Sequence, residues 1–191
     1  NEIKWRVPGA RLRIYKSNLY LAPESLLTDY DADSYIMTDN NGYVVRETLD
    51  AAGFLFPVGA DDVSYNPIQV LERGTPDHIG VRCLPASLEN GFDGQPIGTD
   101  VIATAWDIVE SEKGESDLLL TGQWTSGDEL VDFDRNNCTY ARFDFSNGWW
   151  VLDPSSLGPA GGNDPFTRSR KGVPPGLYTI GDGEMPAFFD A

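Results

Sequence analysis

The apolar residues of this chain recur at every second position, in short runs that Gly, Pro, Asn and Asp interrupt. This period is typical of β-strands, because alternate side chains of an extended chain share one face, whereas an amphipathic helix repeats every three or four residues. The runs are also rich in β-branched and aromatic residues, which favour strands. We therefore predict about eleven strands, at residues 11–15, 18–21, 34–38, 43–49, 68–72, 78–84, 101–109, 118–124, 140–145, 149–152 and 177–180.

One predicted strand shows the alternation most clearly. The side chains of Ile79, Val81 and Cys83 fall on one face of the extended chain, and those of His78 and Arg82 fall on the other. This pattern is typical of a half-buried sheet, and we expect His78 to be an outward-facing strand residue.

Turn sequences separate the apolar runs. Residues 40–42 read Asn-Asn-Gly and residues 146–148 read Ser-Asn-Gly, and both predict hairpins because these residues tolerate positive φ. The best helix signal, at residues 23–27, is one turn at most. We therefore predict an all-β fold, namely an antiparallel β-sandwich of about eleven strands with little helix.

The chain is long enough for one large domain or two small ones. Its 191 residues are 40% hydrophobic and include 5 Trp, 8 Tyr and 9 Phe, which can fill a sizeable core. A loop at residues 85–99 divides the predicted strands into two similar sets, so two subdomains are an alternative. We favour one sandwich over residues 10–182, because each half alone would leave its sheet uncovered. Residues 1–9 then form an N-terminal arm and residues 183–191 a C-terminal tail.

The formal net charge of -16 limits which classes of molecule the protein can bind. Nucleic acid is excluded as a partner, because its phosphates require a basic face. Membrane insertion is not expected, because no run approaches the roughly 18 apolar residues that span a bilayer. Many carboxylates favour either solubility or divalent cations.

Three acidic residues at alternate positions form a candidate calcium site, at Asp29, Asp31 and Asp33. The sixth and twelfth positions of an EF-hand loop would be Ser34 and Asn40 rather than Gly and Glu, so that loop type is excluded. The alternative is an acidic, solvated turn. No cofactor other than this Ca²⁺ is expected.

The sequence contains no recognisable catalytic motif. It has a single histidine, and it lacks a nucleophile elbow, a phosphate loop, a zinc motif and a dinucleotide fingerprint. We predict that the protein is not an enzyme. A glycosidase that uses only carboxylates, such as Glu110 with Glu112 or Asp128 with Glu129, is one alternative. A carbohydrate-binding module that stacks exposed aromatics on a glycan, as the pair at residues 149–150 suggests, is another.

The two cysteines form an even pair. Cys83 and Cys138 could close one disulfide, and two cysteines are equally compatible with free thiols in a reducing compartment. Both interpretations stay open at this stage.

Several motifs are similar to those of a known class of module. They include Tyr-Val-Val-Arg at 43–46, Gly-Phe-Leu-Phe-Pro-Val-Gly at 53–59, Tyr-Asn-Pro-Ile at 65–68 and Asp-His-Ile-Gly-Val-Arg at 77–82, with further matches at 106–108, 118–120, 123–124, 129–130, 133–135, 149 and 176–181. Through these, the chain resembles a β-sandwich module of surface and adhesin-like proteins of Bacteroidota that leave the cell by type IX secretion. The resemblance implies an extracellular or cell-surface location, a scaffold or adhesive role, and no catalytic residues.

Both ends of the chain carry apolar residues suited to assembly. Ile3, Trp5 and Val7 alternate with charged residues in the arm, and Phe188 and Phe189 lie in the tail. Such a segment can complete a sheet edge, either within its own chain or in a second subunit. We therefore expect a structural or adhesive building block of an extracellular filament or cell-surface protein, with copies of itself, neighbouring modules or a glycan as partners.

Overall fold

The computed structural model describes residues 1–185 and is all-β. Strands β1 to β17 follow one another along this range, and the helical elements in it are two single 3₁₀ turns, Ser126–Asp128 and Pro154–Ser156. The prediction of an all-β fold with little helix is confirmed.

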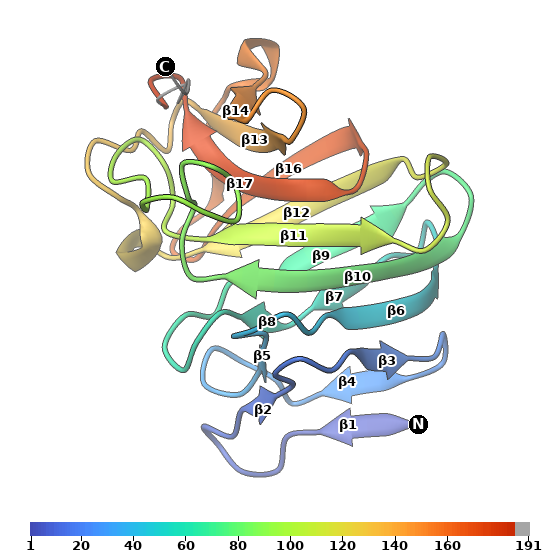
Figure 1. The fold of residues 1–191 in the computed structure, drawn as a ribbon. Helices are drawn as coiled ribbons and strands as arrows, with labels where there is room; N and C mark the ends of the chain where they lie inside the picture. The colour runs from blue at the N-terminus through green and yellow to red at the C-terminus, as the bar shows by residue number, and fades with distance from the viewer. Residues whose placement is uncertain (186–191) are drawn as a thin grey trace.

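Two large sheets form the body of the molecule (Figure 1). The seven-stranded sheet has the order β14 (Trp149–Leu152), β13 (Cys138–Asp144), β17 (Gly176–Asp182), β11 (Ala105–Glu110), β10 (Asp77–Leu84), β6 (Val44–Leu49) and β3 (Leu19–Leu21). The five-stranded sheet has the order β15 (Gly161–Gly162), β16 (Phe166–Val173), β12 (Leu118–Trp124), β9 (Ile68–Glu72) and β7 (Phe54–Phe56). One buried cluster contains side chains of both sheets, so their inner faces pack together in a sandwich-like arrangement. Strands from both sides of the loop at 85–99 share the seven-stranded sheet, which favours one domain over two.

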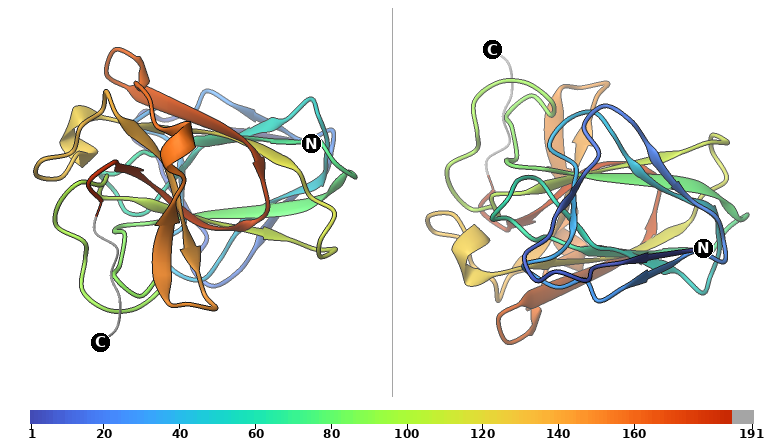
Figure 2. Two further views of the ribbon diagram at one scale, coloured as in Figure 1. Left: turned by 90° about the horizontal axis from the view of Figure 1, so that it is seen from above. Right: turned by 90° about the horizontal axis from the view of Figure 1, so that it is seen from below.

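The N-terminal third winds differently, as a three-sided parallel coil. It contains β1 (Glu2–Lys4), β2 (Leu12–Arg13), β3, β4 (Leu26–Thr28), β5 (Ile36–Met37), β6 and β8 (Val58–Gly59). The parallel pairs Glu2↔Leu26, Leu12↔Ile36 and Leu19↔Val44 are 24, 24 and 25 residues apart in sequence. Each turn of about this length therefore stacks one strand on each of three sides, and Figure 2 shows the outermost turn end-on in blue.

Strands lie at all the predicted positions, but the structure has more of them than the eleven expected. The predicted antiparallel pairing holds in the two large sheets except where β3 pairs in parallel with β6, and it does not hold in the coil. Each of the eleven predicted ranges overlaps a strand of the structure. Residues 23–27, where the strongest of the weak helix signals lies, form no helix and lead into β4. The hairpin expected at residues 40–42 is wrong, because β5 pairs with β2 and β8 rather than with β6. There Gly42 makes a close approach to the preceding turn, since a Cβ would lie 2.5 Å from the carbonyl oxygen of Ser17. The hairpin at 146–148 is confirmed, with Asp144 opposite Trp149.

The alternation expected in β10 is confirmed. Ile79, Val81 and Cys83 are fully buried, and His78 is exposed. The Nδ1 atom of His78 accepts a hydrogen bond from the backbone N–H of Thr48 at 3.0 Å, which is a structural role on the sheet surface.

A small residue on one sheet makes room for two large ones on the other. Trp106 and Tyr140 are fully buried, with ring centroids 6.3 Å apart. The indole N–H of Trp106 donates to the carbonyl of Asn66 at 2.8 Å, and the N–H of Gly122 donates to the hydroxyl of Tyr140. A Cβ on Gly122 would lie 2.7 Å from that hydroxyl oxygen and 2.8 Å from the Trp106 ring. The two sheets can approach this closely only because position 122 lacks a side chain.

We predict that Gly122→Ala lowers the free energy of unfolding by about 1–3 kcal/mol, because overpacking forces the Trp106 and Tyr140 rings from their positions. Urea unfolding with an unchanged m value measures this loss. Gly98→Ala is the matched control, since a Cβ there meets nothing within 4 Å. Equal midpoints for the two variants would contradict the role given to Gly122.

Candidate functional site

Three edge strands lie together at the N-terminal end of the molecule. β1, β2 and β3 are each an edge strand of their sheet. Each is paired on one side only, with a strand that lies nearer the body of the molecule (Figure 1). A hollow of about 210 Å³ lies between β1 and β3. Its lining is mixed: apolar residues contribute together with two glutamates and two other polar residues, namely Asn1, Glu2, Ile3, Leu19, Tyr20, Leu21, Ala22, Ser25 and Glu47. We call this surface, made by the outer edges of β1, β2 and β3, the end face.

The backbone of the end face has donors that point away from the body. In β3 the N–H of Leu19 donates to the carbonyl of Tyr43 at 2.9 Å, so the N–H of the next residue, Tyr20, lies on the opposite edge. In β2 the N–H of Leu12 donates to Tyr35 at 2.9 Å, which places the N–H of Arg13 outward in the same way. Exposed strand edges of this kind can add a further strand.

The end face is basic on an acidic protein. Residues 1–16 contain five basic residues and one acidic residue, a net +4. Since the whole chain has 14 basic and 30 acidic residues, residues 17–191 have 9 and 29, a net -20. Lys4 and Arg13 pair with Asp29 and Asp39, each at 3.0 Å, whereas Arg6 and Lys16 are exposed.

The residues predicted for assembly have different environments. Ile3 packs against the core, and Trp5 is only 8% exposed, with its ring edge-on to Tyr30 at 6.3 Å. Val7 is 65% exposed. The arm therefore pairs within its own chain, where Trp5 fills an apolar slot. Phe188 and Phe189 lie outside the described residues.

The candidate calcium ligands do not converge. Asp29 pairs with Lys4, and one carboxylate oxygen of Asp31 accepts the N–H of Asp33 at 2.9 Å, which closes a local turn. Within residues 1–185 no group of three or more His, Cys, Asp or Glu side chains is arranged to hold a metal ion. The structure thus fits the alternative of a solvated acidic turn.

The disulfide considered for Cys83 and Cys138 is absent, and both buried thiols are free. Cys83 lies on β10 and Cys138 on β13, with β11 and β17 between them in the sheet. Three strand spacings amount to about 14 Å, whereas the Cα atoms of a disulfide lie no more than about 7 Å apart. Burial raises the pKa of the Cys83 thiol to about 12 and that of Cys138 to about 11.

We predict that iodoacetamide at mildly alkaline pH leaves both thiols of the folded protein unmodified and alkylates both in urea, because the reactive thiolate is disfavoured by burial. Mass spectrometry of the labelled protein counts the adducts. The raised pKa values also mean that the folded state holds these protons more tightly than the unfolded state, so the thiols' contribution to stability is lost as pH rises above the unfolded value toward 11–12. Rapid labelling of the native protein would contradict the burial.

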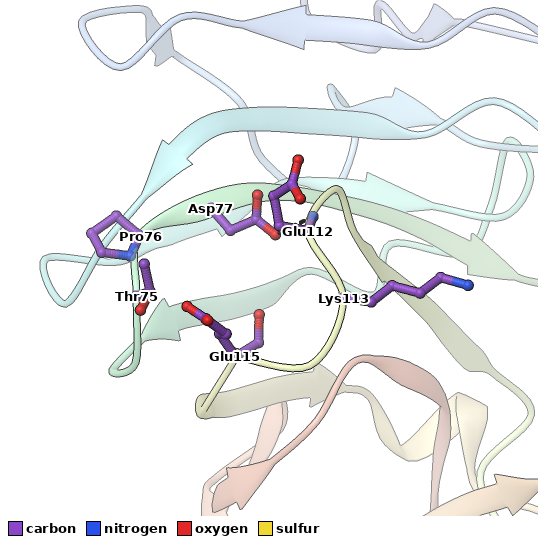
Figure 3. Close-up of a pocket in the computed structure, with 7 residues that line it drawn as sticks. Thr75, Pro76, Asp77, Glu112, Lys113 and Glu115 are labelled. Atoms are coloured by element: carbon purple, nitrogen blue, oxygen red, sulfur yellow. Dashed lines mark hydrogen bonds between the residues drawn. The ribbon is translucent and has the colours of Figure 1, made fainter.

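An acidic cleft of about 260 Å³ lies between two loops at the end of β10 (Figure 3). The carboxylate of Asp77 accepts the N–H of His78 at 2.6 Å and that of Glu112 at 2.9 Å, so it ties the loop after β9 to the loop after β11. Glu115 lies across the cleft, and the Lys113 side chain points away. Asp77 therefore has a structural role in joining these loops.

Three of the four carboxylates considered for a glycosidase, those of Glu110, Asp128 and Glu129, have structural partners. Glu110 accepts the N–H of Gly114 at 3.0 Å, within the loop after β11. Asp128 accepts the N–H and hydroxyl of Thr125 at 2.7 and 2.9 Å, and Glu129 accepts the indole N–H of Trp124 at 3.0 Å. These contacts stabilise turns and give no support to an acid–base pair.

A larger groove of about 470 Å³ crosses the outer face of the seven-stranded sheet, over β11 and β17. Phe92 and Phe145 form part of its wall, stacked with ring centroids 5.4 Å apart and planes 28° apart. They are 45% and 58% exposed. We call this surface the aromatic groove; its lining is Phe92, Asp107, Ile108, Val109, Glu110, Lys113, Gly114, Phe145, Pro175, Gly176 and Leu177.

A buried ion pair supports one side of the aromatic groove. Arg82 lies directly opposite Asp107 across β10 and β11, with Nε 2.9 Å from the carboxylate. The Tyr43 hydroxyl donates to the same carboxylate oxygen. The Arg82 guanidinium lies between the Tyr43 and Phe92 rings, 5.1 Å from each centroid. Together these contacts hold Phe92 against the sheet.

Sequence reasoning missed this network. The alternation in the predicted strands places Arg82 and Asp107 on outward positions, but only the register of β10 on β11 makes them neighbours. No sequence spacing encodes that register.

We predict that Arg82→Met lowers the free energy of unfolding by about 3–5 kcal/mol, because it leaves the carboxylate of Asp107 buried without its charge partner. The double variant Arg82→Met with Asp107→Leu should recover most of this loss. Thermal and urea unfolding of the two variants provide the comparison. A double variant no more stable than Arg82→Met would contradict this assignment.

No family model, curated protein or solved structure matches the chain. The resemblance to Bacteroidota surface modules therefore stays a prediction, and the function has to be argued from the geometry. Within residues 1–185, no helix has the length and apolar character to cross a membrane.

Proposed function

We propose that the protein is a structural or adhesive building block that polymerises by strand addition at its end face. The observation that carries the proposal is the set of three edge strands at one end, of which β2 and β3 have outward backbone donors, beside a hollow that is partly apolar. In this proposal, residues 10–182 form the sandwich of the repeating unit, the arm completes its end coil, and the assembly is extracellular or on the cell surface.

The charge of the end face favours a head-to-tail contact. Residues 1–16 have a net +4, and although Lys4 and Arg13 are paired with Asp29 and Asp39, the positive charges of Arg6, Arg11 and Lys16 oppose the pairing of two end faces. A basic end face on one copy and an acidic surface on the next attract each other. A contact between two different surfaces does not close, so it generates a filament.

We propose the C-terminal tail of a second copy as the strand that is added. Residues 186–191 contain Phe188 and Phe189 for the apolar hollow and Asp190 for the basic edge. The chain reaches Met185 beside β14, at the opposite end of the seven-stranded sheet from β3.

The proline variant Tyr20→Pro tests the edge. Proline removes the outward N–H of Tyr20 and spares the bonds that β3 makes to β6. We expect the wild type to form polymers that grow with concentration and Tyr20→Pro to be monomeric, as measured by light scattering and electron microscopy. Tyr20→Phe, which keeps both the N–H and the ring that lines the hollow, is the matched control and should polymerise.

A second variant tests the tail that we propose as the added strand. Phe188→Ala with Phe189→Ala should also give monomers, and adding salt should weaken the wild-type polymers because the attraction is electrostatic. A wild-type protein that stays monomeric at millimolar concentration would overturn the assembly function. Polymers of Tyr20→Pro equal to those of the wild type would overturn strand addition at the end face.

A further inference from the structure

A second groove runs beside β14, the edge strand of the seven-stranded sheet. It has a volume of about 300 Å³. We call it the β14 groove; its lining is Trp149, Trp150, Val151, Leu152, Pro154, Asp182, Gly183 and Met185. We propose that residues 186–191 bind in the β14 groove of their own chain and are withheld there from other copies. The binding itself is independent of the assembly proposal, whereas its effect on polymerisation rests on that proposal.

The structure fixes where this segment begins. The N–H of Met185 donates to the carbonyl of Asp182 at 3.2 Å, and the N–H of Glu184 donates to the Asp182 carboxylate at 2.9 Å, so a tight turn follows β17. The Met185 side chain lies against β17, since a Cβ on Gly181 would overlap its sulfur. It also packs on the small core cluster that contains Trp150. The residues after Met185 therefore start at the groove, and this tether gives them an effective concentration on the order of millimolar there.

The β14 groove and the residues that follow it in sequence have matching chemistry. The lining is mainly apolar, and the side chain of Val151 is 45% exposed. The one carboxylate in the lining, that of Asp182, is buried, and both of its oxygens already accept backbone N–H groups. Residues 186–189 read Pro-Ala-Phe-Phe. An apolar groove favours this apolar segment as its occupant, because binding removes both surfaces from water.

The segment is long enough to cover the strand. The four residues of β14 extend over about 13 Å, and residues 186–191 can extend over about 20 Å. Within residues 1–185, β14 pairs with β13 alone. An unpaired apolar edge favours unwanted association between chains, and proteins commonly cover such edges with another segment of the fold. Residues 186–191 are placed to do so because they follow Met185 directly.

Binding in the β14 groove competes with strand addition at the end face. Phe188 and Phe189 cannot occupy both places at once, so only a molecule whose tail is released can donate it to the next copy. If the tail is released in about one molecule in ten, the apparent affinity of assembly is about tenfold weaker than the intrinsic affinity. The β14 groove thus sets the concentration at which the proposed polymers form.

Acrylamide quenching of tryptophan fluorescence tests the binding. Trp149 is half-buried, whereas the other four tryptophans are at most 8% exposed, so the quenching reports mainly on this groove. At concentrations where light scattering detects monomers, Phe188→Ala with Phe189→Ala should lose protection against acrylamide. Val151→Asp, which places a charge in the groove, should lose it too. Val63→Ala is the matched control, since Val63 is 82% exposed and lies outside the lining, and it should behave like the wild type.

Equal quenching of the wild type and either test variant overturns the proposal. Protection that increases with protein concentration also overturns it, because a contact within one chain does not depend on concentration. Val151→Asp should in addition form polymers at about a tenfold lower concentration than the wild type. An unchanged threshold would overturn the competition. If both proteins stay monomeric while their quenching differs, the assembly proposal fails and binding of the tail in the β14 groove stands.

Discussion

The close contact between Gly122 and the rings of Trp106 and Tyr140 fixes how the two large sheets meet. Because this contact sets the position of β11, it also sets the surface on the other side of that strand. Trp106 points into the core, and its neighbour Asp107 points outward to Arg82 and the aromatic groove. The position of β11, which the core packing sets, therefore also determines the geometry of the groove on the outer face.

The strands themselves could be predicted from the sequence, because side-chain alternation is a local property. The positions of β9, β12 and β14 follow directly from it. The parallel coil could not be predicted, since β4, β5 and β8 contain only two or three paired residues each and their partners are about 22 to 25 residues away. The predictions also missed β16, because its middle reads Thr-Arg-Ser-Arg-Lys and looks like a polar loop.

The candidate sites were harder to predict than the strands, because each site depends on which residues become neighbours in the folded chain. Asp29, Asp31 and Asp33 alternate in sequence, but Asp29 forms an ion pair with Lys4 from the adjacent turn of the coil. Two cysteines in a sequence suggest a disulfide, but Cys83 and Cys138 are too far apart to form one because two strands lie between them in the sheet. The aromatic groove draws on Phe92, Val109 and Phe145 from three separate segments. The composition shows that aromatic residues are abundant, but it does not show that Phe92 and Phe145, which lie in a loop and a turn outside the strands, become exposed neighbours.

The coil has a consequence for how related chains can differ in length. Since each turn of about 24 residues stacks on the previous one through backbone hydrogen bonds, inserting or removing one whole turn would change the height of the molecule by a single strand spacing, about 4.8 Å. The sandwich beyond it would keep its packing. The geometry of the coil therefore allows its length to change in whole turns while the packing of the two large sheets stays the same.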